Sequence, residues 1–179
     1  MATHNFVNTT HITAMNVDAY NLAAVCASDV DNGLFVTLSS MNVASTTNAI
    51  QGYEYTVTLA GQNASEIYVV DAPEVGWTLE MQMSNDPRVF YTPAGKPMSI
   101  KYMNPKVDCI EEPATAFAAG TLPAANTKGQ YVAVSANGKL GAASAQAPQN
   151  GAYFRIEGFH YTAIGGEKVA TVVLRCMAN

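Results

Sequence analysis

The sequence predicts an all-β protein, a compact β-barrel or β-tulip-like domain with little helix. Short runs of aromatic and β-branched residues recur along the chain, and the clearest of them, 52–59, alternates as a half-buried strand does. Gly, Pro, Asn and Asp interrupt the runs at short intervals, which favours turns between strands. Only 18–27 leaves open a short helical turn, or a strand that follows it.

The N-terminal half supplies an arm and three strands. Residues 1–20 are rich in Asn, Thr and His without a clear period, which predicts an extended N-terminal arm ahead of a single β-rich domain, 21–179. A turn at 31–33, where Gly33 takes the positive φ that other residues resist, leads into a strand at 34–38. The strands at 52–59 and 67–70 follow, and Pro73 ends the last of them.

The C-terminal half supplies the remaining strands. Two prolines bracket Gly95 and predict a turn between 89–92 and the strand at 99–103. The strand at 107–110 is expected to end in a solvated turn at Glu111-Glu112, and 111–129 is expected to be a loop anchored by Phe117. Asn137-Gly138 predicts a hairpin that joins 130–134 to 139–140. Strands at 152–159 and 169–175 complete the sheet.

Composition narrows the class of partner. The length, 179 residues, fits one domain, and the charged fraction of 13% is about half of that in a typical protein. Such a neutral polar surface suits a protein packed against neighbours, and also many secreted β-proteins. The net charge of −5 and the lack of a basic cluster argue against nucleic acid as a partner. No long apolar segment indicates a membrane, and residues 1–16 lack the features of a secretory signal, so synthesis in the cytoplasm is expected.

The sequence contains no recognisable catalytic or metal-binding motif. Cys26, Cys109 and Cys176 stand singly, without the spacing of a zinc site, and are interpreted as buried free thiols. We find no nucleophile elbow, calcium loop or phosphate loop, so the prediction is a protein that is not an enzyme, with no catalytic, metal or cofactor-binding residue and no cofactor. Trp77, near Met81 and Met83, is either a core residue or an anchor at an interface.

Several short motifs, taken in order between residues 29 and 175, resemble those of the head decoration or capsid-stabilising proteins of tailed bacteriophages. They are the turn and strand at 31–38, the Tyr-bearing strand at 53–57, Ala-Pro-Glu-Val at 72–75, the segment 91–97 with Ala-Gly-Lys-Pro, and the hairpin at 129–140. The resemblance implies a β-barrel on the exterior of an expanded capsid, bound to the major capsid protein and self-associating, with a trimer favoured. It also implies a location in the virion after synthesis in the host cytoplasm. At 104–108 the chain departs from the family pattern.

The arm is the candidate contact with the capsid. Phe6, Val7, Ile12 and Val17 stand among Asn and Thr, and we hypothesise that residues 3–17 add as a strand to an exposed capsid edge. Deleting residues 2–17 is then expected to abolish capsid binding and to leave the fold intact. A disordered tail is the alternative.

Other functions remain open at this point. A tail or head-fibre structural protein also needs a β-rich body that self-associates. A small-molecule or glycan-binding β-barrel is a candidate of another class, in which Tyr53, Tyr55, Tyr68 and Tyr102 line a pocket. Packing of these tyrosines on a sheet face is the more common use of such residues.

Overall fold

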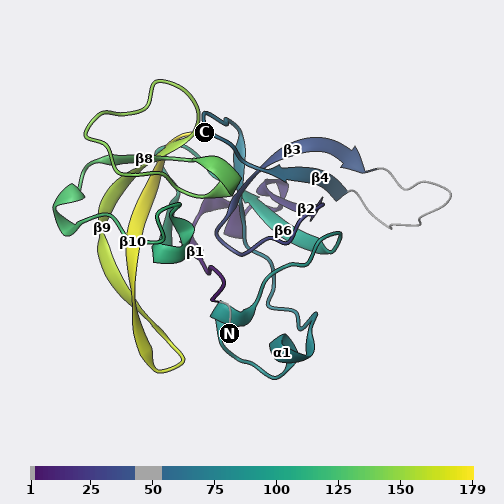
Figure 1. The fold of residues 1–179 in the computed structure, drawn as a ribbon. Helices are drawn as coiled ribbons and strands as arrows, with labels where there is room; N and C mark the ends of the chain where they lie inside the picture. The colour runs from purple at the N-terminus through teal and green to yellow at the C-terminus, as the bar shows by residue number, and fades with distance from the viewer. Residues whose placement is uncertain (1–2, 43–53) are drawn as a thin grey trace.

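The computed structural model describes residues 3–42 and 54–179, and it is nearly all β, as the sequence predicts. Two bodies lie side by side, a closed five-stranded barrel and a second five-stranded sheet (Figure 1). Helix is confined to one turn of α-helix, α1 (Leu79–Gln82), and short 3-10 turns. These turns are η1 (Thr13–Met15), η2 (Asp18–Tyr20), η3 (Pro87–Val89), η4 (Ala114–Ala116), η5 (Ala125–Thr127) and η6 (Ala136–Gly138). No helix of the described part is long and apolar enough to cross a membrane.

The barrel comes from the first 102 residues and closes in the order β2-β4-β3-β5-β6. Its strands are antiparallel to their neighbours except for the pair β2 and β4, which is parallel. Full closure leaves the barrel without a free strand edge. The strands are β2 (Asn21–Cys26), β3 (Phe35–Asn42), β4 (Glu54–Leu59), β5 (Ile67–Val70) and β6 (Pro97–Tyr102).

The second sheet joins the two ends of the chain in the order β1-β7-β10-β9-β8, and all its pairs are antiparallel. β9 and β10 are the longest strands, with 12 residues each, and their far ends extend below the body as a two-stranded ribbon (Figure 1). The strands are β1 (Asn8–His11), β7 (Cys109–Pro113), β8 (Tyr131–Ala133), β9 (Tyr153–Ile164) and β10 (Glu167–Ala178).

The apolar run at 34–36 explains how the two bodies hold together. Leu34 and Val36 pack in the cluster that fills the barrel, whereas Phe35 packs in the larger cluster between barrel and sheet. Because alternate residues of a strand face opposite sides, a strand buried on both faces is apolar at every position. On β5, Val69 belongs to the larger cluster and Val70 to the barrel interior.

Most of the predicted elements are confirmed, but the strand predicted at 107–110 begins only at Cys109, because 105–107 form a turn. Two larger corrections concern Glu111-Glu112 and the N-terminal segment. Val134 bridges Leu140 across the Asn137-Gly138 turn, and Phe117 is buried, as predicted. Cys26 and Cys176 are buried free thiols, whereas Cys109 is only half-buried.

The solvated turn predicted at Glu111-Glu112 is wrong: β7 continues to Pro113, and Glu112 is fully buried because β10 pairs with it. Gly52 and Tyr53, at the start of the predicted second strand, lie outside the described residues.

The N-terminal segment, residues 3–17, is the other correction. It was predicted to form part of an extended arm, but in the structure it packs on the body, and β1 is an edge strand of the second sheet beside β7. Phe6 and Ile12 have exposed fractions of only 7% and 3%. The physical reason is that the apolar residues of this segment find buried positions against their own chain.

Candidate functional site

Four carboxylates hold the N-terminal segment in place, and no pattern in the sequence predicts these contacts. Asp31 accepts hydrogen bonds from the backbone N–H of Asn5 (3.1 Å) and pairs with the His4 ring (2.8 Å). The side chain of Thr9 donates to Asp71, which also pairs with Lys101. Because the acceptors come from both the barrel and the sheet, the segment ties the two bodies together.

The other two carboxylates are fully buried. Asp108 accepts from the backbone N–H and the hydroxyl of Thr13, at 2.8 and 2.6 Å. Glu112 accepts one hydrogen bond, 3.1 Å long, from the Asn5 side-chain amide, and its Oε1 has no partner among the described residues. Burial in apolar surroundings raises the pKa of Glu112 well above its ordinary value, and the Asn5 hydrogen bond opposes that shift.

The four residues predicted to contact a capsid differ in their exposure to solvent. Ile12 lies in the large apolar cluster and Val7 packs against it, while Phe6 is buried beside β7 and β10. Val17 alone is exposed, at 38%, just before η2. Of these four residues, only Val17 is therefore exposed enough in this conformation to offer an apolar surface to another molecule.

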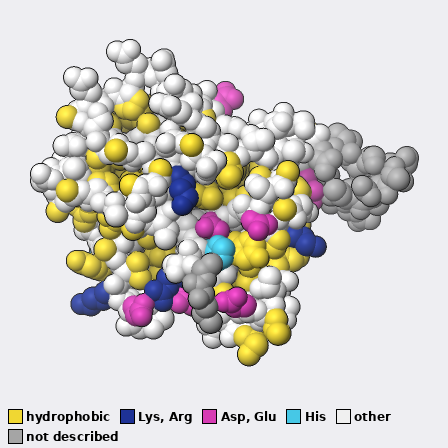
Figure 2. All heavy atoms as spheres, in the orientation of Figure 1, with side chains coloured by type: hydrophobic (Ala, Val, Ile, Leu, Met, Phe, Trp, Pro, Cys, Tyr) yellow, Lys and Arg dark blue, Asp and Glu magenta, His cyan; other side chains and the backbone are white. Residues whose placement is uncertain are grey.

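Exposed apolar side chains gather instead in residues 73–83, which we call the apolar lobe. Leu79 and Met83 are exposed at 72% and 81%, and Val75 at 42%. Figure 2 shows hydrophobic side chains at the surface next to several acidic ones on this side of the molecule. An apolar group of this kind, with polar residues around it, is typical of an interaction surface.

Local hydrogen bonds fix the shape of the lobe. The Thr78 hydroxyl caps α1 by accepting from the backbone N–H of Met81 at 3.3 Å, and Met81 is buried below it. Gln82 donates its side-chain amide to the carbonyl of Gly76 at 2.9 Å, and any side chain at Gly76 would collide with Gln82. α1 therefore turns Leu79 and Met83 outward while Met81 anchors it.

The lobe carries two carboxylates, Glu74 and Glu80, for which the described residues supply no ion pair within 4.0 Å. Asp86 beside it is paired with Arg88, which lowers the pKa of that carboxyl, and Arg88 also binds Glu167 at 2.7 Å. Glu74 and Glu80 are exposed. Partial burial, together with Asp86 and Asp71, raises the pKa of Glu74, as expected for an acid among acids.

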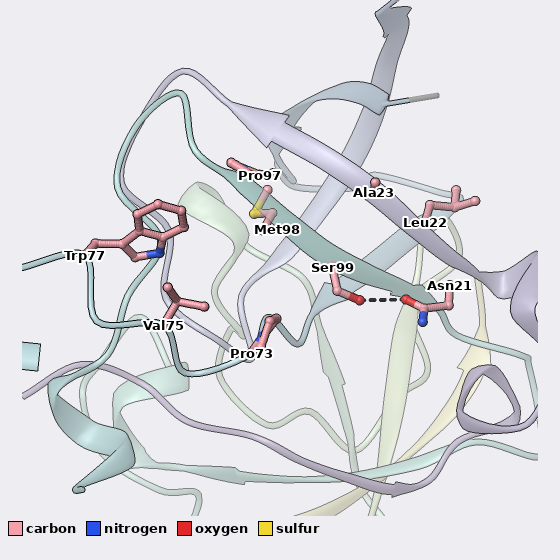
Figure 3. A pocket seen from close by; sticks show the side chains of 9 residues that line it. All are labelled: Asn21, Leu22, Ala23, Pro73, Val75, Trp77, Pro97, Met98 and Ser99. Atoms are coloured by element: carbon pink, nitrogen blue, oxygen red, sulfur yellow. Dashed lines mark hydrogen bonds between the residues drawn. The ribbon is translucent and has the colours of Figure 1, made fainter. Parts of the chain in front are cut away.

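A groove of about 500 Å³ lies between the lobe and the outer face of the barrel (Figure 3). Trp77, Val75 and Pro73 form one wall, and β2 and β6 form the other. Asn21 and Ser99 are hydrogen-bonded to each other at one end, at 2.6 Å. The Lys96 ammonium lies over the Trp77 ring, 5.2 Å from its centre. The groove is lined by Asn21, Leu22, Ala23, Pro73, Val75, Trp77, Pro97, Met98 and Ser99.

The structure also places Trp77 and the tyrosines that were candidates for a ligand pocket. Trp77 is half-buried and lines the groove, so it is placed as an interface anchor would be. The tyrosines proposed to line a ligand pocket pack together instead: Tyr68 and Tyr102 stand edge to face, 5.4 Å apart, and Tyr55 and Tyr68 pack against the barrel core. Tyr53 lies outside the described residues. The described part of the chain holds no group of three or more His, Cys, Asp or Glu placed to bind a metal ion.

A search of family models, of curated proteins and of solved structures finds no match for this chain. The resemblance to capsid decoration proteins therefore stays a prediction based on short motifs.

Proposed function

We propose that this protein is a non-enzymatic binding protein whose partner is the outer surface of a phage capsid, which it stabilises in the expanded state. One observation carries the proposal, the apolar lobe, where Leu79 and Met83 are largely exposed at the two ends of a capped helical turn. The motif resemblance supplies the identity of the partner, the major capsid protein. The low charged fraction of the chain, 13%, suits a protein packed between neighbours on a lattice.

The lobe indicates the chemistry of the partner surface. Its acidic neighbours Glu74 and Glu80 favour a contact patch with an apolar anchor among Lys or Arg side chains. Such a contact steadies the shell only if it binds the expanded state more tightly than the compact one, since a ligand shifts an equilibrium by its differential affinity. Many modest contacts are sufficient because the lattice presents many sites at fixed geometry.

The test is the number of copies of this chain in purified particles, measured by quantitative mass spectrometry against the major capsid protein. A count in the hundreds, in a simple ratio to capsid subunits, is expected. A few copies, or a multiple of six, would favour the tail or head-fibre alternative. Absence from particles would overturn both.

The groove beside Trp77 favours a second candidate, a small-molecule or glycan-binding protein. Its volume, about 500 Å³, falls within the usual range for ligand sites, and its walls are apolar with a few polar groups at the ends. A ligand held there is expected to raise the melting temperature in a saturable manner, and Trp77→Ala is expected to remove that increase. Thermal-shift screening of glycans and small aromatic compounds, with Val107→Ala as the control variant, tests this candidate.

A further inference from the structure

The far half of β9 is a strand edge with which no strand other than β10 pairs in the described part of the chain. At its end Thr162, Ala163 and Ile164 line a pocket with the N-terminal segment, and Ile164 is buried. The hydrogen bonds that β9 makes to β8 and to the residues just before β8 end at Ile156. The N–H of Ile156 donates to the carbonyl of Gln130, and its C=O accepts from the N–H of Gly129. From there to Ile164, β9 is paired only with β10. The ribbon that results extends away from the body (Figure 1). Unpaired strand edges readily pair with another chain.

The opposite edge of the same ribbon is covered. Glu167 of β10 binds Arg88, and Val169 and Ala170 line a cavity with Phe6 of the N-terminal segment. β7 pairs with β10 from Thr171 onward. The open edge of the ribbon is thus on the β9 side alone.

Apart from a bulge at Glu157, where it begins, the open edge carries few of the devices that usually protect one. Residues 158–166 contain no Lys, Arg, Asp, Glu or Pro. Tyr161 is exposed at 66% and Phe159 at 37%, two residues apart. The Glu111 carboxylate of β7 pairs with the His160 ring at 3.2 Å and accepts a hydrogen bond from the Thr162 hydroxyl at 3.3 Å. Glu157, just before the segment, is paired with Arg175 at 2.6 Å. Residues 158–166 themselves add no charged Asp, Glu, Lys or Arg to the edge, so apart from Glu111, which pairs with His160, little repulsion between like charges opposes a second copy.

We propose that two copies of this chain pair through these edges, β9 to β9 and antiparallel, about a two-fold axis near His160 and Tyr161. An antiparallel ladder has the same hydrogen-bond pattern when read from either strand, so an edge is complementary to itself. The pairing joins two five-stranded sheets into one and buries Phe159 and Tyr161 of both copies. It does not involve the apolar lobe, so it is separate from the proposed capsid contact.

The test is sedimentation of the full chain over a range of concentrations. A monomer–dimer equilibrium is expected, and Tyr161→Lys is expected to raise the dimer dissociation constant at least about tenfold, because a Lys at a strand edge opposes pairing. Val107→Lys introduces the same charge at a site that is equally exposed, at 68%, and is expected to keep the dimer. Circular dichroism checks that each variant is folded.

Hydrogen exchange gives a second readout that needs no variant. Amides of residues 158–164 are expected to gain protection as the protein concentration rises, and those of the apolar lobe are not. A monomer at all concentrations, a trimer, or a dimer equally weakened by both Lys variants would overturn the proposal. Capsid binding by Tyr161→Lys would leave the proposed function standing. Failure of the dimer proposal can therefore be distinguished from failure of the capsid-binding proposal.

Discussion

The ring of Phe35 lies 5.0 Å from that of Phe154, and this contact joins the barrel to the second sheet. Phe35 belongs to β3 and Phe154 to β9, and both are fully buried. The two bodies therefore share one apolar cluster and are expected to unfold together.

Phe154→Ala is expected to lower the free energy of unfolding by about 3–5 kcal/mol, as for other buried aromatic residues cut back to Ala. Urea unfolding followed by both circular dichroism and Trp77 fluorescence measures it. Val107→Ala, at an exposed position, is the control and is expected to change stability by less than about 0.5 kcal/mol. Separate transitions for the two probes in the wild-type protein would contradict the single shared cluster.

Gly33→Ala is expected to destabilise the protein more than Gly95→Ala. Both glycines have positive φ, +83° and +74°, so both substitutions carry the cost of the left-handed backbone, about 1 kcal/mol. Only at Gly33 would the new Cβ collide, with the Asn5 amide and with the Glu112 oxygens at 2.7 and 2.8 Å. Chemical unfolding of the pair measures the difference, and equal losses would show that Asn5 and Glu112 move aside freely.

Ile12→Ala is expected to cost about 2–5 kcal/mol of stability, because Ile12 is buried in the large cluster. Val17→Ala, at the exposed end of the same segment, is the matched control and is expected to cost less than about 0.5 kcal/mol. By the same reasoning, deleting residues 2–17 is now expected to damage the fold. A deletion variant with unchanged melting temperature would restore the idea of a dispensable arm.

Double substitution of Leu79 and Met83 by Ser is expected to leave the melting temperature unchanged, because both side chains are exposed. If the proposed function is correct, the same variant occupies fewer sites on purified particles. Quantitative mass spectrometry after rebinding measures the occupancy. Val107→Ser is the control that removes an exposed apolar side chain elsewhere, and equal occupancy by both variants would remove the lobe from the contact.

Local pattern predicted the strands but not what lies against them. The alternation at 54–59 and the Asn137-Gly138 turn act over a few residues, so they could be seen in the sequence. The pairing of β1 with β7 joins residues about a hundred positions apart, and no local feature of 8–11 indicates it. Glu112 was misjudged for the same reason: a Glu beside Pro is usually solvated, and only the long-range pairing with β10 buries it. The apolar lobe can be predicted in part from the sequence, because Trp77, near Met81 and Met83, is a candidate anchor at an interface.

Glu112→Gln is expected to change how stability depends on pH. The folded state holds the pKa of Glu112 above its value in the unfolded chain, mainly through burial. Between those two pKa values the folded state binds more protons than the unfolded state, so stability is fully present below the unfolded pKa and falls as pH rises through the folded pKa. The groups facing Glu112 are the Asn5 amide and, farther away, the negative Asp71, which adds to the cost of ionisation.

The Gln variant cannot ionise and keeps an oxygen for the Asn5 hydrogen bond. Its unfolding free energy is therefore expected to fall less steeply than that of the wild type above about pH 4.5, the ordinary pKa of Glu. Urea unfolding at a series of pH values from 4 to 9 measures both curves. Glu80→Gln, on an exposed carboxyl, is the control and is expected to follow the wild type. Parallel curves for Glu112→Gln and the wild type would mean that Glu112 does not stay protonated in the folded state. The Asn5 side-chain amide would then donate its hydrogen bond to an ionised carboxylate.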